Sequence, residues 1–148
     1  MSPRALTREA RPGLAVSLIA EFKVIPHESD PMDPFPEECE LISFFEVEPT
    51  IADAGVPWAY NQLDFVTERE SDYVHCVIEP GYETLVFRWS KNGDAIVELD
   101  LKQVKGLEVE NRGSETLVAS FRQGHALLPL RIQLRPRVRV FWGTTSEL

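Results

Sequence analysis

The sequence predicts an all-β protein, an antiparallel meander of about nine or ten short strands that forms a sandwich or a barrel. Apolar and polar residues alternate in short runs beyond residue 72, and the runs recur roughly every 8–12 residues. Asn92-Gly93 lies between two such runs, and this dipeptide is a strong hairpin signal because both residues tolerate positive φ. No helical pattern exceeds about ten residues, so we expect at most one short helical turn, near 50–55.

The first half of the chain combines a tail, a strand and a long loop. We expect residues 1–12 to be a flexible tail and residues 13–148 a single β domain, because 148 residues fit the usual size of one domain. The alternation in residues 14–25 predicts a first strand. Residues 26–40 contain four prolines and six acidic residues, which disfavour both helix and strand, so an acidic, Pro-rich loop is expected there. The remaining elements of this half are a strand at 41–48, the helical turn near 50–55 and a short strand at 63–66.

The second half alternates more strictly. Leu85, Phe87 and Trp89 share one parity, and so do Val97, Leu99 and Leu101, so each set is expected on the core face of its strand. The predicted strands of this half are 73–79, 84–90, 95–101, 104–110, a strand carrying Leu117, Ala119 and Phe121, and a last strand over 131–142.

The last predicted strand carries a row of arginines: Arg131, Arg135, Arg137 and Arg139. In a strand they would line one face, and Pro136 would place that strand at an edge or a bend. Three interpretations stay open. The row guards an exposed edge against aggregation, it pairs with acids of neighbouring strands, either Glu98 and Asp100 or Glu108 and Glu110, or it is a contact site for an anion or a carboxylate.

The acidity of the chain belongs to one segment. Residues 26–72 contain thirteen Asp and Glu against the single Arg69, a net charge of −12 in a chain whose total is −9. Clustered acids attract a basic partner over long range, and Met32 is a candidate apolar anchor among them. The candidate partner-binding residues are Asp30, Asp33, Phe35, Glu37, Glu38 and Glu40.

The sequence contains no motif that specifies catalysis. Neither Cys39 nor Cys76 has metal-ligand or disulfide spacing, and Cys76 alternates with apolar neighbours as a buried small side chain. The three histidines are far apart in sequence. We therefore expect no catalytic residues, no metal and no cofactor. Trp58 and Tyr60 follow Pro57 and either plug one end of the domain or line the mouth of a pocket.

Net charge also bears on partners and location. An acidic protein repels phosphate, so nucleic acid is not expected as a partner. No run approaches the ~18 apolar residues of a membrane span, so no membrane association is expected. Cysteines without a disulfide pattern favour a cytoplasmic location. The sequence leaves the oligomeric state open.

In size and charge, this small acidic β domain resembles the immunity and inhibitor proteins with which bacteria cover basic toxin surfaces; no specific motif is shared. The resemblance implies a non-catalytic protein–protein interaction module that binds a basic partner through its acidic 26–72 segment. A small-molecule-binding β barrel is the alternative, and an enzyme of undefined class is the third choice.

Overall fold

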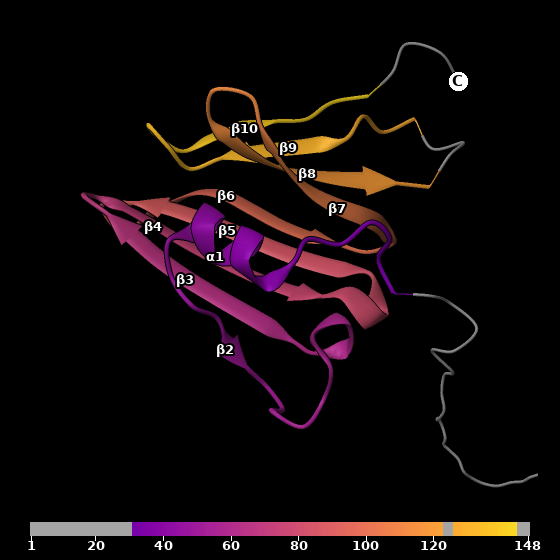
Figure 1. Cartoon of the computed structure of the whole chain (residues 1–148). Coiled ribbons are helices and arrows are strands. Elements are labelled where there is room, and N and C mark those ends of the chain that lie inside the picture. The colour runs from indigo at the N-terminus through magenta and orange to yellow at the C-terminus, as the bar shows by residue number, and fades with distance from the viewer. Residues whose placement is uncertain (1–30, 123–125, 145–148) are drawn as a thin grey trace, which may run out of the picture. The chain divides into compact units, whose positions relative to one another are not determined.

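The computed structural model describes residues 31–122 and 126–144. These residues form nine strands in two antiparallel sheets (Figure 1). The five-stranded sheet consists of β2 (Thr50–Ile51), β3 (Leu63–Arg69), β4 (Asp72–Glu79), β5 (Thr84–Lys91) and β6 (Asp94–Leu101). The four-stranded sheet consists of β7 (Val104–Asn111), β8 (Glu115–Phe121), β9 (Leu130–Gln133) and β10 (Arg139–Phe141).

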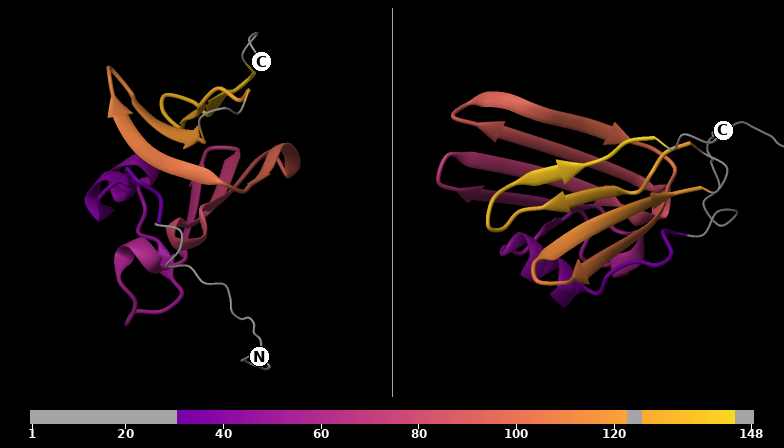
Figure 2. Two further views of the ribbon diagram at one scale, coloured as in Figure 1. Left: turned by 90° about the vertical axis from the view of Figure 1, so that its right-hand side faces the viewer. Right: turned by 90° about the horizontal axis from the view of Figure 1, so that it is seen from above.

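Strands that are adjacent in each sheet are also consecutive in sequence, so the predicted antiparallel meander is confirmed. Of the two architectures left open by the sequence, the described residues form the sandwich, with one sheet over the other (Figure 2). The chain passes from β6 to β7 through Lys102 and Gln103. The tail at 1–12 and the strand at 14–25 lie outside the described residues and stay predictions.

The hairpin turns follow the turn chemistry of the sequence. Asn92 and Gly93 join β5 to β6 with φ of 54° and 85°. This left-handed backbone matches the right-handed twist of the flanking strands, which explains why an Asn-Gly pair is found at this position. The alternation in β5 and β6 keeps the predicted parity, with Phe87 opposite Leu99.

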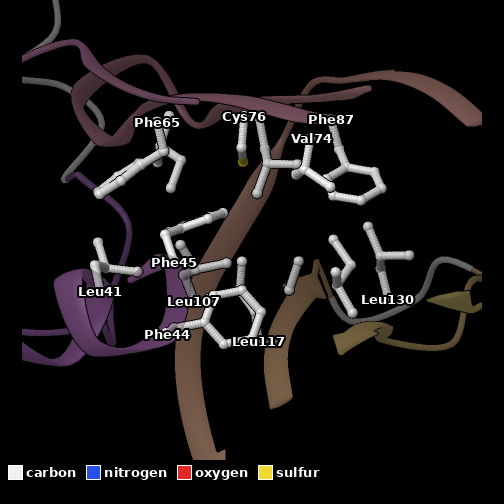
Figure 3. Packing of buried hydrophobic residues seen from close by; sticks show 14 of the residues in the cluster. Leu41, Phe44, Phe45, Phe65, Val74, Cys76, Phe87, Leu107, Leu117 and Leu130 are labelled. Carbon is white, nitrogen blue, oxygen red and sulfur yellow. The ribbon is translucent and has the colours of Figure 1, made fainter. Parts of the chain in front are cut away.

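The hydrophobic core lies between the sheets and is closed on one side by α1 (Glu38–Phe45). Figure 3 shows Phe65 and Cys76 pointing from the five-stranded sheet toward Leu107 of the four-stranded sheet, with Phe45 of α1 between them. The rings of Phe45 and Phe65 stack with centroids 4.3 Å apart. Burying each such large apolar side chain contributes roughly 1.5–3 kcal/mol.

The strand predicted at 41–48 is wrong, because these residues mostly belong to α1. Leu41, Phe44 and Phe45 are buried, and their spacing of i, i+3 and i+4 places all three on one face of a helix. That face packs against β3, β7 and β8. The helical period therefore prevails over the shorter alternation of Phe45 and Val47.

Acidic residues define the beginning of α1. The backbone N–H of Glu37 donates to Oε1 of Glu40 at 2.9 Å, half of a capping box. Glu46 has φ of 61° and ends the helix in the left-handed region. The helical turn predicted near 50–55 is also misplaced: Thr50 and Ile51 form β2, which pairs with β3.

The described part of the predicted 26–40 loop follows the edge of β7 and then enters α1. The backbone N–H of Asp33 donates to the carbonyl of Lys105 at 2.8 Å, and that of Leu107 donates to the carbonyl of Pro34 at 2.8 Å. Residues 31–36 thus satisfy backbone groups of an edge strand, which otherwise pair with water or with another chain.

Two residues fix this segment in place. Met32 is 3% exposed and belongs to the hydrophobic core, so the expectation that it anchors a partner is wrong. On the facing strand, a Cβ at Gly106 would lie 2.9 Å from Cδ of Pro34 and 3.0 Å from the carbonyl oxygen of Asp33. The close approach of the two backbones therefore requires glycine.

The strand predicted over 131–142 is a hairpin. β9 and β10 pair antiparallel, and Pro136 lies in the connection between them. Leu134 and Val138 are buried on either side of this bend, which maintains the apolar alternation through the turn. The prediction of one continuous strand is therefore wrong, although β10 does form an edge of its sheet.

Among the described residues there is no helix long and apolar enough to cross a membrane.

Candidate protein-binding surface

Acidic side chains from two elements border one groove of about 420 Å³. Glu40 comes from the first turn of α1, and Glu108 and Glu110 come from β7. Arg112, just after β7, is the one basic residue of the lining, so acids outnumber bases three to one. Phe35 and Val109, both half-buried, contribute apolar surface. Carboxylates around an apolar floor suit a lysine or arginine side chain, whose aliphatic stem packs while its charged head reaches the acids.

Local structure positions Glu40 at this groove. Its side chain accepts the backbone N–H of Glu37, so its Oε1 is held toward the start of the helix. Negative charge at a helix N-terminus is favourable, since the first backbone N–H groups carry partial positive charge. The same glutamate therefore stabilises α1 and supplies charge to the groove.

The contribution of β7 follows from alternation on an edge strand. Glu108 is exposed, and Glu110 is half-buried with its Oε1 3.0 Å from Nη1 of Arg131. One of the three interpretations of the arginine row paired it with acids of neighbouring strands, and the structure shows such a pair between Arg131 and Glu110. Glu98 and Asp100, the other acids of that interpretation, lie on β6 of the five-stranded sheet. None of the three interpretations placed Glu108 at the same groove as Glu40, because no local pattern in the sequence indicates that residues 31–36 follow β7.

The predicted partner-binding residues are brought together in part. Phe35 and Glu40 line the groove, while Glu37 and Glu38 are exposed beside it at the start of α1. Asp33 is exposed where its backbone pairs with β7. Asp30 lies outside the described residues.

The arginine row is divided among different surroundings. Arg131 and Arg139 share the outer face of the β9–β10 hairpin, since Arg131 lies opposite Phe141 and Arg139 opposite Gln133. The guanidinium carbon of Arg139 lies 5.0 Å from the centroid of the Phe141 ring, within range of a cation–π contact.

The two arginines of the connection point elsewhere. Arg135 joins α1 to β8: Nη1 donates to Oε2 of Glu46 at 2.8 Å, Nη2 donates to the carbonyl of Ser43 at 3.1 Å, and Nη2 also pairs with Glu115. Arg137 lines a small cavity between the sheets. The expected single face of four arginines is therefore wrong.

The aromatic pair at the connection before β3 divides into an anchored and an exposed residue. Nε1 of Trp58 donates to the carbonyl of Pro36 at 3.1 Å, and its ring lies 6.2 Å from that of Phe35. Trp58 thereby supports the apolar side of the acidic groove. Tyr60 is 55% exposed.

Two side chains of types that can act in catalysis, a histidine and a cysteine, lie among the described residues of the five-stranded sheet. Nε2 of His75 lies 2.8 Å from Oδ1 of Asp64, on the outer face of the five-stranded sheet. Burial, and secondarily the charge of Asp64, raises the pKa of the Cys76 thiol far above its ordinary value, which makes it a poor nucleophile. No group of three or more potential metal ligands occurs among residues 31–122 and 126–144. His27 and His125 lie outside the described residues.

By its fold and surface, this protein is a two-sheet antiparallel β sandwich with an acidic groove at one edge. The structure is similar to one chain of a contact-dependent growth inhibition toxin–immunity protein complex from Klebsiella pneumoniae 342, with a TM-score of 0.65 and 16% sequence identity. The alignment covers 78% of this chain and 99% of that chain. At this identity the comparison establishes a shared fold. No protein-family model and no curated protein matches the sequence.

Proposed function

We propose that this protein is a non-catalytic, immunity-like interaction module that binds a basic protein through its acidic 26–72 segment. The binding surface is the groove between α1 and β7, where Phe35 and Glu40 of that segment meet Glu108 of β7. The observation that carries this proposal is the convergence of acids from both halves of the chain around an apolar floor.

Charge and apolar surface act at different stages of association between two proteins. A cluster of like charges raises the encounter rate with an oppositely charged partner by about 10- to 1000-fold at low salt. The apolar floor then adds contacts that persist after encounter, because aromatic side chains such as Phe35 are frequent anchors at protein interfaces. The charges therefore raise the association rate and favour basic partners, while the apolar contact lengthens the lifetime of the complex.

The structural comparison supports the same class of function. The similar chain comes from a complex of a toxin with its immunity protein, and nearly all of that chain aligns with this one. An inhibitory or immunity-like role accounts for an acidic surface without requiring a catalytic centre. The buried, protonated thiol of Cys76 is consistent with such a role.

The test is affinity capture from lysate of the native host, followed by mass spectrometry. Deleting residues 31–37 would remove the buried Met32 and is unsuitable, so charge substitution is the better design. The double variant Glu40→Gln with Glu108→Gln removes two charges from the groove, and glutamine at 40 still supports the capping box. The control variant Glu98→Gln with Asp100→Asn removes two charges from exposed positions on β6, in the other sheet.

We expect the native protein and the β6 control to capture the same basic protein at about 0.1 M salt and to lose it at about 1 M, where the Debye length falls from roughly 10 Å to 3 Å. The groove variant should capture much less at low salt. Capture of a basic partner with equal yield by the groove variant would assign the interface to another surface. Cytoplasmic fractionation of the captured pair would test the predicted location.

A further inference from the structure

A second feature, independent of the acidic groove, lies between the two sheets. A cavity of about 130 Å³ is lined by the ends of β3, β4 and β5 on one side and by the β9–β10 hairpin on the other. Its apolar wall includes Val74, Leu134 and Val138, which are 2%, 4% and 8% exposed. The cavity is thus embedded at the margin of the hydrophobic core.

The charged lining is biased toward cations, in contrast to the chain as a whole. Arg69, Lys91 and Arg137 line the cavity together with two acids, Glu70 and Asp72. Asp72 is already engaged within the chain: its Oδ1 accepts Nε1 of Trp89 at 2.9 Å and lies 3.4 Å from Nζ of Lys91. Three cations and two acids give the lining a net charge of +1. Because Lys91 and Asp72 pair with each other, this charge comes from Arg69 and Arg137 against Glu70.

Arg69 is held in a defined position across the gap between the sheets. Its Nη1 donates to the carbonyl of Leu134 at 3.3 Å, so the guanidinium of one sheet is fixed against the hairpin of the other. A guanidinium has five N–H donors, and one such contact leaves donors that suit a planar carboxylate. Arg137, exposed on the connection after Pro136, adds a second guanidinium to the lining.

Size narrows the class of ligand. An engineered apolar protein cavity of about 150 Å³ binds benzene, so a space of about 130 Å³ accepts a body with the size of one small ring or a short acyl chain. We propose that this cavity binds a small organic carboxylate, with the apolar body against Val74, Leu134 and Val138 and the carboxylate against Arg69 and Arg137.

The experiment uses benzoate as the probe and neutral benzamide as its near-isosteric control, with the full chain. Amide chemical shifts recorded during titration should move for Val74, Leu134 and Val138 with benzoate. Arg137→Gln should weaken benzoate binding roughly tenfold, as expected for loss of a charge-assisted hydrogen bond. Arg139→Gln removes the same charge outside the cavity lining and should leave the affinity unchanged.

Three results would overturn the proposal. The first is that the amide chemical shifts of these three residues do not change up to about 10 mM benzoate, a concentration that would reveal even millimolar affinity. The second is equal affinity for benzamide, which would remove the role of the guanidinium groups. The third is equal weakening by Arg137→Gln and Arg139→Gln, which would indicate nonspecific attraction to surface charge. Each readout is independent of partner capture at the acidic groove.

Discussion

Gly106 shows how one residue controls the placement of a whole segment. Its lack of a Cβ lets the backbone at Asp33 and Pro34 approach β7 closely enough to hydrogen-bond with it. That contact starts the path of the chain into α1 and positions Phe35 beside the groove. A glycine inside a predicted strand signals a bulge or a close backbone approach, but the sequence does not name the approaching segment.

Gly106→Ala should destabilise the protein by about 1–3 kcal/mol, because the new methyl overlaps rigid proline and backbone atoms. The measurement is urea unfolding followed by circular dichroism. Gly55→Ala is the matched control, because its added Cβ meets its nearest atom at an ordinary 3.5 Å. Equal stability of the two variants would contradict the close packing of residues 33–34 on β7.

Arg135 connects the C-terminal end of α1 to β8 through three acceptors. Arg135→Ala should lower the free energy of unfolding by about 1 kcal/mol, since the bonds are charge-assisted but partly exposed to solvent. Arg137→Ala, in the same connection, should change it by less than about 0.5 kcal/mol. Thermal unfolding of both variants at low and high salt checks this difference, which salt should reduce; equal effects would remove the structural role assigned to Arg135.

The two cysteines should differ sharply in reactivity. Cys39 is exposed and Cys76 is buried, and burial raises the pKa of Cys76 so that it stays protonated in the folded protein. A thiol reagent should label one cysteine per native chain and two per unfolded chain. Above the ordinary pKa of 9.0, the Cys76 thiol loses its proton in the unfolded chain but keeps it in the folded protein. The free energy of unfolding should therefore fall as pH rises through about 9. Native labelling of Cys76 at the rate of Cys39 would contradict its burial.

At the scale of elements, the sequence predicted β4 to β8 because their alternation and turn residues are local signals. It failed at α1, where Leu41, Phe44 and Phe45 satisfy the helical period, while Phe45 and Val47 also satisfy the strand period. In an eight-residue helix the two patterns overlap, and packing against β3, β7 and β8 decides between them.

The role of α1 in the core is open to a direct test. Phe45→Ala should destabilise the protein by about 3–5 kcal/mol, because it removes a ring stacked on Phe65 and leaves a cavity between the sheets. Cys39→Ala, on the exposed face of the same helix, should be close to neutral. Chemical unfolding of both variants measures the difference, and a small effect of Phe45→Ala would argue against a core position.

The prediction of one continuous strand over 131–142 failed for a different reason. Alternation of apolar and polar residues indicates which side chains face the core. The pattern is the same whether the strand continues through Pro136 or turns back there, because Leu134 and Val138 are buried in either case. The sequence therefore predicted the buried residues of this region correctly but not its direction. The wrong prediction that all four arginines share one face followed from that one error.

At the scale of the whole molecule, the acidic groove joins residues that are distant in sequence. The acids of the 26–72 segment were evident from composition, so the candidate residues Phe35 and Glu40 could be named. Glu108 could not be added, because its proximity to Glu40 depends on residues 31–36 following β7. The small cavity is equally a product of tertiary structure, since Arg69 and Arg137 come from different sheets.

The central claim is that a basic partner binds at the groove formed by α1 and β7, and the association rate with that partner tests it most directly. Stopped-flow or surface plasmon resonance would measure the rate between about 0.1 M and 1 M salt. We predict that Glu40→Gln with Glu108→Gln slows association about tenfold at low salt, while Glu98→Gln with Asp100→Asn has little effect. A rate independent of salt, or equal slowing by the two double variants, would contradict the claim.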